Sequence, residues 1–250
     1  MNKNDVTIVV ASSVLPSHPD TRIIDEAIRS IRHYFPKNEI IIQIDGLRSE
    51  RFNRKDDYDE YKNKILWKSL HEDVNLLPII FNEHSHQTTM MFETIDMIKT
   101  PLMLYVEADA PVTTDLDIDW DKCINAIESG FANTIRFHFE SHIPIEHSHL
   151  MYGLENGFMK TTQWSQRPHL TTVDYYKRII LPHVPAKSFI EDTTHGYIQE
   201  DCKIHGEDGF QKHKLFIYHP EGSIKRSYHT DGREGTRKFT SDDDTWGYIE

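Results

Sequence analysis

Short apolar runs and amphipathic stretches alternate along the first 110 residues. Four runs are long enough for a buried strand and too short for a typical helix: Val6–Ala11, Glu39–Ile44, Leu76–Phe81 and Leu102–Val106. Between them, apolar residues recur at helical spacing from about 20 to 35, 57 to 71 and 88 to 99. Strands that alternate with helices pair in parallel, so the pattern predicts a doubly wound, mostly parallel α/β sheet with a Rossmann-like nucleotide-binding half.

The pattern after residue 112 is less regular. We expect a helix over Trp120–Ser129, a loop over Glu140–Asn156, a helix over Thr172–Leu181 and another towards Ile204, with strands at Thr134–Phe139, Phe158–Trp164 and Leu215–Tyr218. A chain of 250 residues fits one domain of this kind. We therefore predict a single domain over 1–250, with a nucleotide-binding half (about 1–112) and a C-terminal half (about 113–250).

Two acids follow the fourth apolar run. Glu107 and Asp109 stand one residue apart where the predicted strand ends. Ligands of open α/β sheets bind outside the carboxyl ends of the strands, and carboxylates there suit a divalent cation beside a phosphorylated ligand. The structural alternative is that these acids only terminate a strand.

A second acidic pair lies in the stretch Ser188–Gly196. Glu191 and Asp192 fall at the predicted start of a helix, where the helix dipole stabilises ionised carboxylates. The structural alternative is that one of them only caps the helix.

Charge limits the possible partners of the protein. The net charge is −12, which opposes non-specific binding to nucleic acid or to an anionic membrane. Residues 201–240 differ, because they carry eight Lys or Arg against six Asp or Glu. An anionic ligand is therefore favoured only near the C-terminal segment.

The cysteines and the apolar runs indicate a compartment. Cys123 and Cys202 lie far apart in no metal-binding or disulfide pattern, which fits a reduced cytoplasmic location. The sequence opens on a predicted strand with no leader, and no apolar run reaches the roughly 18 residues of a membrane span. We expect no membrane insertion. The histidines of His84-Ser85-His86 are expected to be exposed to solvent.

The order of four short motifs resembles the GT-A nucleotide-diphospho-sugar glycosyltransferases, of the family-2-like kind. The motifs are V-T-I-V-V-A-S-S at the first strand, I-I-I-Q-I-D at the second, L-Y-V-E-A-D at the fourth, and the late F-I-E-D. The resemblance covers roughly residues 6 to 200. It implies a hexosyl- or pentosyltransferase with a nucleotide-sugar donor.

The resemblance also assigns roles to residues. Ser12, Ser13 and Asp45 map onto positions that hold the nucleoside. Glu107 and Asp109 map onto the Asp-x-Asp motif that binds Mn²⁺ or Mg²⁺ through the donor diphosphate, with Glu replacing the first Asp.

The remaining roles concern the reaction and a third metal ligand. Asp192, with Glu191 beside it, maps onto the general base of inverting members, and His229 onto a C-terminal histidine that binds metal in some members. A late carboxylate suits a single displacement, because the acceptor hydroxyl loses its proton as it attacks.

Three other functions compete with this interpretation. A sugar-phosphate nucleotidyltransferase shares the architecture, but Ser12–Pro19 contains no Gly for its phosphate-binding loop. A non-catalytic sugar- or nucleotide-binding protein of the same fold is the second. A histidine-rich metal hydrolase is the third, and no His-x-x-x-His pair falls on a predicted helix. The acceptor stays open among a glycan, a small molecule, a protein and a hydroxylated DNA base, as does the oligomeric state.

Overall fold

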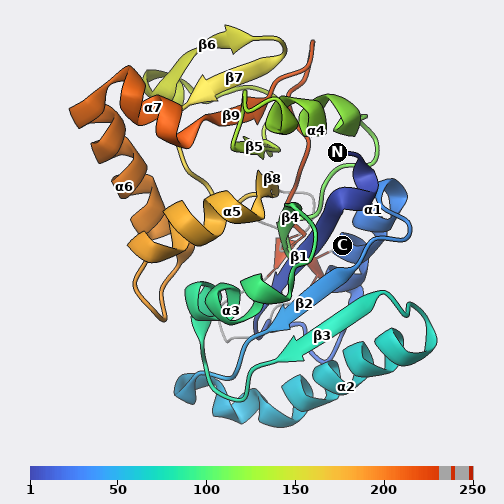
Figure 1. Ribbon diagram of the computed structural model, residues 1–250. Coiled ribbons are helices and arrows are strands. Elements are labelled where there is room, and N and C mark those ends of the chain that lie inside the picture. Colours follow the sequence, from blue (N-terminus) through green and yellow to red (C-terminus); the bar gives the residue numbers. More distant parts are fainter. Residues whose placement is uncertain (231–237, 240–247, 250) are drawn as a thin grey trace.

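One nine-stranded sheet runs through the chain in the order β3-β2-β1-β4-β8-β5-β9-β7-β6 (Figure 1). The computed structural model describes residues 1–230, 238–239 and 248–249. The mixed α/β architecture agrees with the fold class predicted from the sequence. A two-residue pair, β10 (Lys238–Phe239) and β11 (Tyr248–Ile249), lies outside this sheet.

The first half is the doubly wound unit that the apolar pattern predicts. The strands are β1 (Val6–Ser12), β2 (Ile40–Ile44), β3 (Leu76–Ile80) and β4 (Leu102–Glu107), and these four strands pair with one another in parallel. The helices between them are α1 (Arg22–Tyr34), α2 (Lys55–His71) and α3 (His86–Thr94). Strand order reverses at β1, which lies between β2 and β4, so the carboxyl ends of these strands face a common crevice.

The second half adds strands of both directions. It contains α4 (Trp120–Glu128), β5 (Thr134–Arg136), β6 (Met151–Glu155), β7 (Phe158–Thr161), β8 (His169–Thr172), α5 (Val173–Tyr175), α6 (Ile190–His205), α7 (Glu207–His213) and β9 (Leu215–Tyr218). Strand β8 pairs antiparallel with both β4 and β5, whereas β5 and β9 are parallel. The chain thus joins its two halves through β8.

The sequence analysis missed β8, β6 and α7. The segment that forms β8, His169-Leu170-Thr171-Thr172, has one large aliphatic residue and directly precedes or begins the helix predicted over Thr172–Leu181. The segment that forms β6 lies in the stretch expected to be a loop, and its residues are mostly exposed. Strands this short owe their stability to pairing with distant neighbours, which local periodicity does not record.

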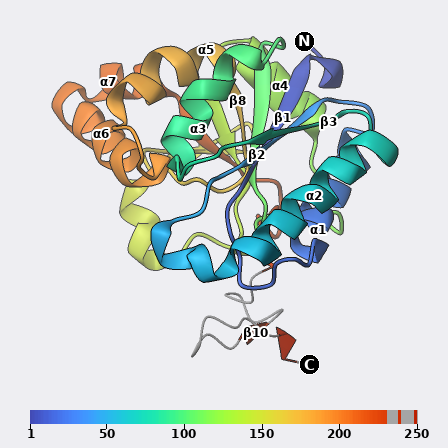
Figure 2. The same ribbon diagram turned by 90° about the horizontal axis from the view of Figure 1, so that it is seen from below.

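Both faces of the sheet are covered by helices (Figure 2). Alternate residues of β1 point to opposite faces, so Ile8 and Val10 join a core with α1, α2 and α4, while Val9 and Ala11 join a core with α3, α5 and α6. Both cores exclude solvent from the central strands. The rigid sheet therefore fixes the loops at its carboxyl edge.

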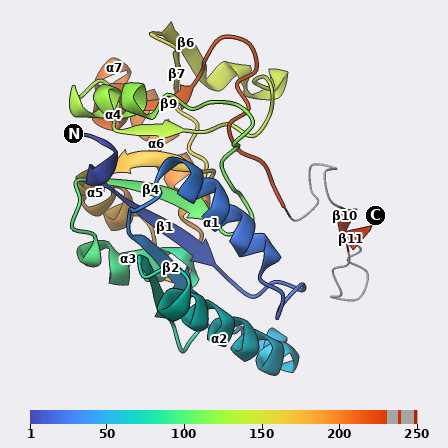
Figure 3. The same cartoon turned by 90° about the vertical axis from the view of Figure 1, so that its right-hand side faces the viewer.

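The segment after β9 returns to the exit of β4 (Figure 3). Ser227 forms a bridge with Val112, and the backbone N–H of Thr230 donates to the carbonyl of Asp109 at 2.9 Å. The Tyr228 hydroxyl donates to Glu26 of α1 at 2.8 Å. This return places the C-terminal segment beside the acidic motif.

No described helix combines the length and the apolar character that a membrane span requires.

Two glycines in the second half give a test of the packing of α7 on α6. A Cβ on Gly209 of α7 would lie 2.5 Å from the carbonyl oxygen of Asp201, whereas a Cβ on Gly196 of α6 would meet nothing within 4 Å. We expect Gly209→Ala to lower the free energy of unfolding by about 1–3 kcal/mol, because the helices must separate. Gly196→Ala is the matched control and should raise stability by roughly 0.5–1 kcal/mol. Urea denaturation measures both, and equal effects would contradict the close packing.

Candidate functional site

A cavity of about 320 Å³ opens at the carboxyl ends of β1, β2 and β4. The residues that the sequence analysis assigned to the nucleotide and to the acidic motif all line it: Ser12, Ser13, Asp45, Glu107 and Asp109. Other lining residues include Arg48, His84, His86, Gln87 and Phe189. The structure therefore brings segments from five parts of the chain into one site.

Asp45 follows β2 and is almost completely buried. Its Oδ1 atom accepts the backbone N–H groups of Gly46 at 2.8 Å and Ser85 at 2.7 Å, and both carboxylate oxygens lie within 3.3 Å of the backbone nitrogen of His86. Its Oδ2 atom is 2.7 Å from Nδ1 of His84. The carboxylate thus meets several donors from the loop after β3.

This carboxylate caps helix α3. Ser85, at the N-cap position, makes no side-chain capping hydrogen bond of its own, and the N–H of His86, the first residue of α3, donates to Asp45 instead. A negative charge is also favourable at the positive end of the helix dipole. The fit requires Gly46, since a Cβ there would lie 2.1 Å from the carbonyl carbon of Glu83.

Helix α2 contacts the end of β1 and the loop that follows it. The buried hydroxyl of Ser12 is 2.8 Å from that of Tyr61, whereas Ser13 is exposed to the cavity. His18 stacks on Tyr61 with ring centroids 3.8 Å apart, and its Nδ1 accepts the N–H of Leu15 at 3.1 Å. Ser13 is therefore the better placed of the two serines to contact a ligand.

The acidic motif occupies the opposite side of the cavity. Glu107 and Asp109 are half-buried at the exit of β4. The side-chain amide of Gln87, in the first turn of α3, donates to Oε1 of Glu107 at 2.5 Å. This bond orients the Glu107 carboxylate and connects the acidic motif to the helix that Asp45 caps.

His229 lies near this motif but faces another group. The residue is buried, and the neighbouring Thr230 is bonded to the backbone of Asp109. Its Nε2 atom is in close contact with the guanidinium of Arg167. Binding of a metal through Nε2 would require Arg167 to move.

The start of α6 lies at the edge of the cavity and carries the second acidic pair. Phe189 precedes the helix and lines the cavity, and Ser188 accepts the hydroxyl of Thr88 at 2.8 Å. Glu191 is half-buried, and its Oε2 atom accepts the N–H of Gln166 at 2.8 Å. Asp192 is exposed.

A buried arginine lies near Glu191. Burial lowers the pKa of the Arg136 guanidinium to about 10, and the nearby Glu191 carboxylate opposes that shift. Arg136 also donates to the side-chain oxygen of Gln163 at 2.9 Å. Glu191 is therefore engaged by neighbouring groups of the protein, unlike Asp192.

A second cavity, of about 720 Å³, lies between α6, α7 and the β6–β7 hairpin. Gly196, Gln199 and Lys203 of α6 line it, and Tyr152 and Lys160 of the hairpin lie across from them. Asp192 precedes Gly196 by one helical turn on the same face of α6. Helix α6 thus connects the first cavity, at Phe189, with the second.

Sequence reasoning missed part of the first cavity. It interpreted His84 and His86 as exposed loop residues, but both are half-buried and line the cavity with Arg48 and Gln87. The available signal was their position after the third predicted strand. The rule that selected Glu107 and Asp109 after the fourth strand applies equally there.

Two solved structures are similar to this chain over most of its length. Staphylococcus aureus TarS (residues 1–349, in complex with UDP-GlcNAc) matches with a TM-score of 0.56 and 11% identity over 97% of this chain and 62% of that one. The mannosyltransferase PcManGT from Pyrobaculum calidifontis, in complex with GDP-Man and Mn²⁺, matches with a TM-score of 0.56 and 12% identity, over 92% of this chain and 58% of its own. Both are GT-A nucleotide-sugar glycosyltransferases. The chain has the GT-A fold.

A third structure extends the comparison. GalNAc-T7 with UDP, GalNAc and Mn²⁺ matches with a TM-score of 0.51 and 10% identity, over 90% of this chain and 43% of its own. The GT-A chain described here spans about three fifths or less of the length of these proteins. A scan against protein-family models finds no match, and neither does a search of curated proteins.

His18 makes the loop after β1 sensitive to acid. Burial, reinforced by nearby Arg54, lowers the pKa of His18 from 6.5 to about 3. Between these pH values the unfolded chain binds a proton at His18 that the folded chain does not bind. The contribution of neutral His18 to the free energy of unfolding is therefore complete above about pH 6.5 and declines as the pH falls towards 3.

We expect His18→Gln to reduce the pH dependence of stability. The free energy of unfolding of the wild type should fall by up to about 1.4 kcal/mol per pH unit more steeply than that of the variant below pH 6.5. Urea denaturation between pH 7 and pH 4 measures both slopes. Equal slopes would show that His18 is protonated in the folded protein.

Proposed function

We propose that this protein is a glycosyltransferase that moves a sugar from a nucleotide-diphosphate donor to an acceptor hydroxyl. One observation carries the proposal: Glu107 and Asp109 share a single cavity with Ser12, Ser13 and Asp45, at the strand ends where α/β folds bind their ligands. The GT-A fold supports it, as do the nucleotide-sugars and Mn²⁺ in the similar structures. The half formed by residues 1–112 would hold the donor and the half formed by 113–250 the acceptor.

The acidic motif suits Mn²⁺ or Mg²⁺. Carboxylate oxygens are the ligands these ions prefer, and Glu107 and Asp109 supply them at the cavity wall. Within the described residues, no group of three or more His, Cys, Asp or Glu side chains is arranged to hold a metal. This donor set fits a cation that completes its coordination with phosphate oxygens. Binding of His229 to that cation through Nε2 would require Arg167 to move. When bound, the cation would oppose the negative charge that develops on the departing diphosphate.

The structure favours Asp192 over Glu191 as the general base. Asp192 is exposed on the face of α6 that continues into the second cavity, whereas Glu191 accepts the N–H of Gln166. An acceptor in the second cavity would present its hydroxyl beside Asp192 and opposite the donor phosphates. Proton removal by a carboxylate in that position gives a single displacement with inversion.

We expect Asp109→Asn to abolish metal-dependent transfer and preserve the fold, because Asp109 lies at a strand exit and outside both cores. Turnover should fall at least about 100-fold with the donor that the wild type uses, selected from UDP-, GDP-, CMP- and TDP-sugars with Mn²⁺. Asp115→Asn, at an exposed acid in the following loop, is the control and should keep wild-type turnover. Mass spectrometry of the products measures both. Wild-type turnover by Asp109→Asn in limiting Mn²⁺ would contradict the metal assignment.

Asp192→Asn tests the base. It retains the size of the side chain but loses the proton acceptor, so transfer should fall by about 10² to 10⁴-fold while donor binding and melting temperature stay unchanged. Glu191→Gln removes the charge beside Arg136 and should lower the melting temperature, while its loss of transfer should be smaller than that of Asp192→Asn. If Glu191→Gln loses more transfer than Asp192→Asn, Glu191 is the base. Donor binding without turnover in the wild type would instead favour a non-catalytic binding protein.

A further inference from the structure

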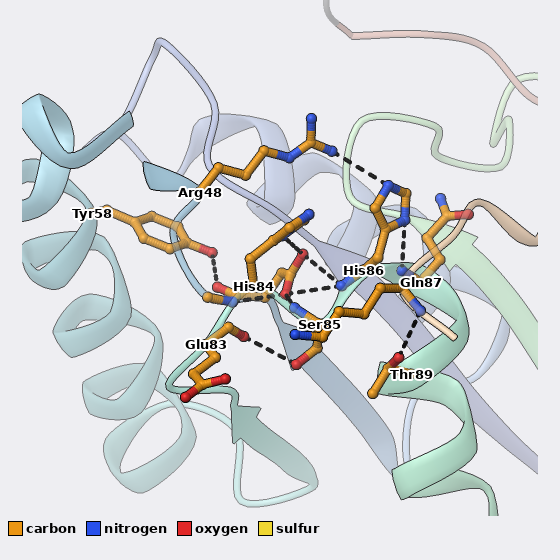
Figure 4. Close-up of polar contacts among 11 residues, drawn as sticks. Arg48, Tyr58, Glu83, His84, Ser85, His86, Gln87 and Thr89 are labelled. Atoms are coloured by element: carbon orange, nitrogen blue, oxygen red, sulfur yellow. Dashed lines mark hydrogen bonds and ion pairs between the residues drawn. The ribbon is translucent and has the colours of Figure 1, made fainter. Parts of the chain in front are cut away.

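Four residues form a wall between the donor cavity and an adjoining groove of about 510 Å³: Arg48, His84, His86 and Phe189. The His86 ring stands edge-on to Phe189 with centroids 4.1 Å apart, and the His84 ring lies 5.2 Å from that of His86. Arg48 approaches His86 from the loop after β2, with Nη2 3.4 Å from Nε2 (Figure 4). Nitrogen-rich side chains from two loops therefore converge beside Asp45.

The Asp45 carboxylate has little remaining capacity to bind a ligand. An ionised carboxylate accepts about four hydrogen bonds. Three of these positions are taken by the backbone N–H groups of Gly46, Ser85 and His86. Nδ1 of His84 lies 2.7 Å from Oδ2, and the Asp45 side chain is only 3% exposed. A nucleobase N–H would have to displace the cap of α3 to reach it.

His84 presents an acceptor to the cavity. Its Nδ1 lies 2.7 Å from Oδ2 of Asp45, although the two atoms are not aligned for a hydrogen bond. Two lone pairs would repel each other at this distance, so we infer that Nδ1 carries the hydrogen. In the neutral imidazole, Nε2 then has a lone pair. The side chain is 27% exposed and lines the cavity. The guanidinium of Arg48 adds N–H donors to the same wall.

We propose that His84 and Arg48 contact the base of the donor nucleotide, and that Asp45 is a positioning residue which acts through them. The inference rests on the proposed function and specifies its donor. One acceptor beside N–H donors complements the C=O, N–H, C=O edge of uracil or thymine. Guanine presents two adjacent N–H donors and needs two acceptors. The expected donor is therefore a uridine or thymidine diphosphate sugar in preference to a guanosine diphosphate sugar.

Isothermal titration with UDP, N3-methyl-UDP and GDP, each with Mn²⁺, tests the contact. Methylation removes the N–H that His84 would accept, so the wild type should bind N3-methyl-UDP about tenfold more weakly than UDP. His84→Ala should bind both with equal affinity. His71→Ala, at an exposed histidine of α2, is the control and should discriminate as the wild type does.

Asp45→Asn separates positioning from direct contact. The amide cannot accept hydrogen bonds at both of its terminal atoms, so the cap of α3 is weakened. We expect a melting temperature several degrees lower and a loss of affinity of similar factor for UDP and GDP. An unchanged melting temperature with an altered UDP-to-GDP ratio would mean that Asp45 contacts the base itself and would overturn the inference.

The outcomes distinguish this inference from the proposed function. Equal binding of UDP and N3-methyl-UDP by the wild type, or full discrimination by His84→Ala, would contradict the inference alone. Tighter binding of GDP than of UDP would do the same. Failure of the wild type to bind any nucleotide diphosphate would contradict the proposed function and the inference together.

Discussion

The contact between the buried Asp45 carboxylate and the N-terminus of α3 determines the arrangement of the site. A buried charge is costly unless it is hydrogen-bonded, and here backbone N–H groups and the helix dipole offset that cost. The capped helix then places Gln87 on Glu107 and Thr88 on Ser188, just before α6. One carboxylate at the end of β2 thus fixes the helix that orients the Glu107 carboxylate and contacts the segment just before α6.

The parallel half of the fold was predictable because its signals are local. Strands β1, β2 and β4 are apolar runs buried on both faces, β3 is a half-buried apolar run at the sheet edge, and each helix between them has its own apolar stripe. The second half depends on pairing between distant segments. Strand β8 has only four residues and is stabilised between β4 and β5, so nothing within it distinguishes a central strand from a loop.

The location of the site was predictable, but not all of its contacts. Acids at strand exits must meet at one edge of a parallel sheet, and Asp45, Glu107 and Asp109 do so. The cap formed by Asp45 joins residues about forty positions apart in the chain, and the sequence contains no pattern for such a contact. The same limit applies to Arg167, whose contact with His229 bears on whether that histidine can bind a metal.

We propose that the cavity at the carboxyl ends of β1, β2 and β4 binds a nucleotide-diphosphate sugar together with a divalent cation. Ligands that bind only the native state raise the melting temperature, so a thermal-shift panel of UDP-, GDP-, CMP- and TDP-sugars, with and without Mn²⁺, tests this most directly. The account predicts a rise with at least one nucleotide-diphosphate sugar that requires Mn²⁺ and is absent in Asp109→Asn. No rise with any member of the panel, or equal rises in the wild type and Asp109→Asn, would contradict it.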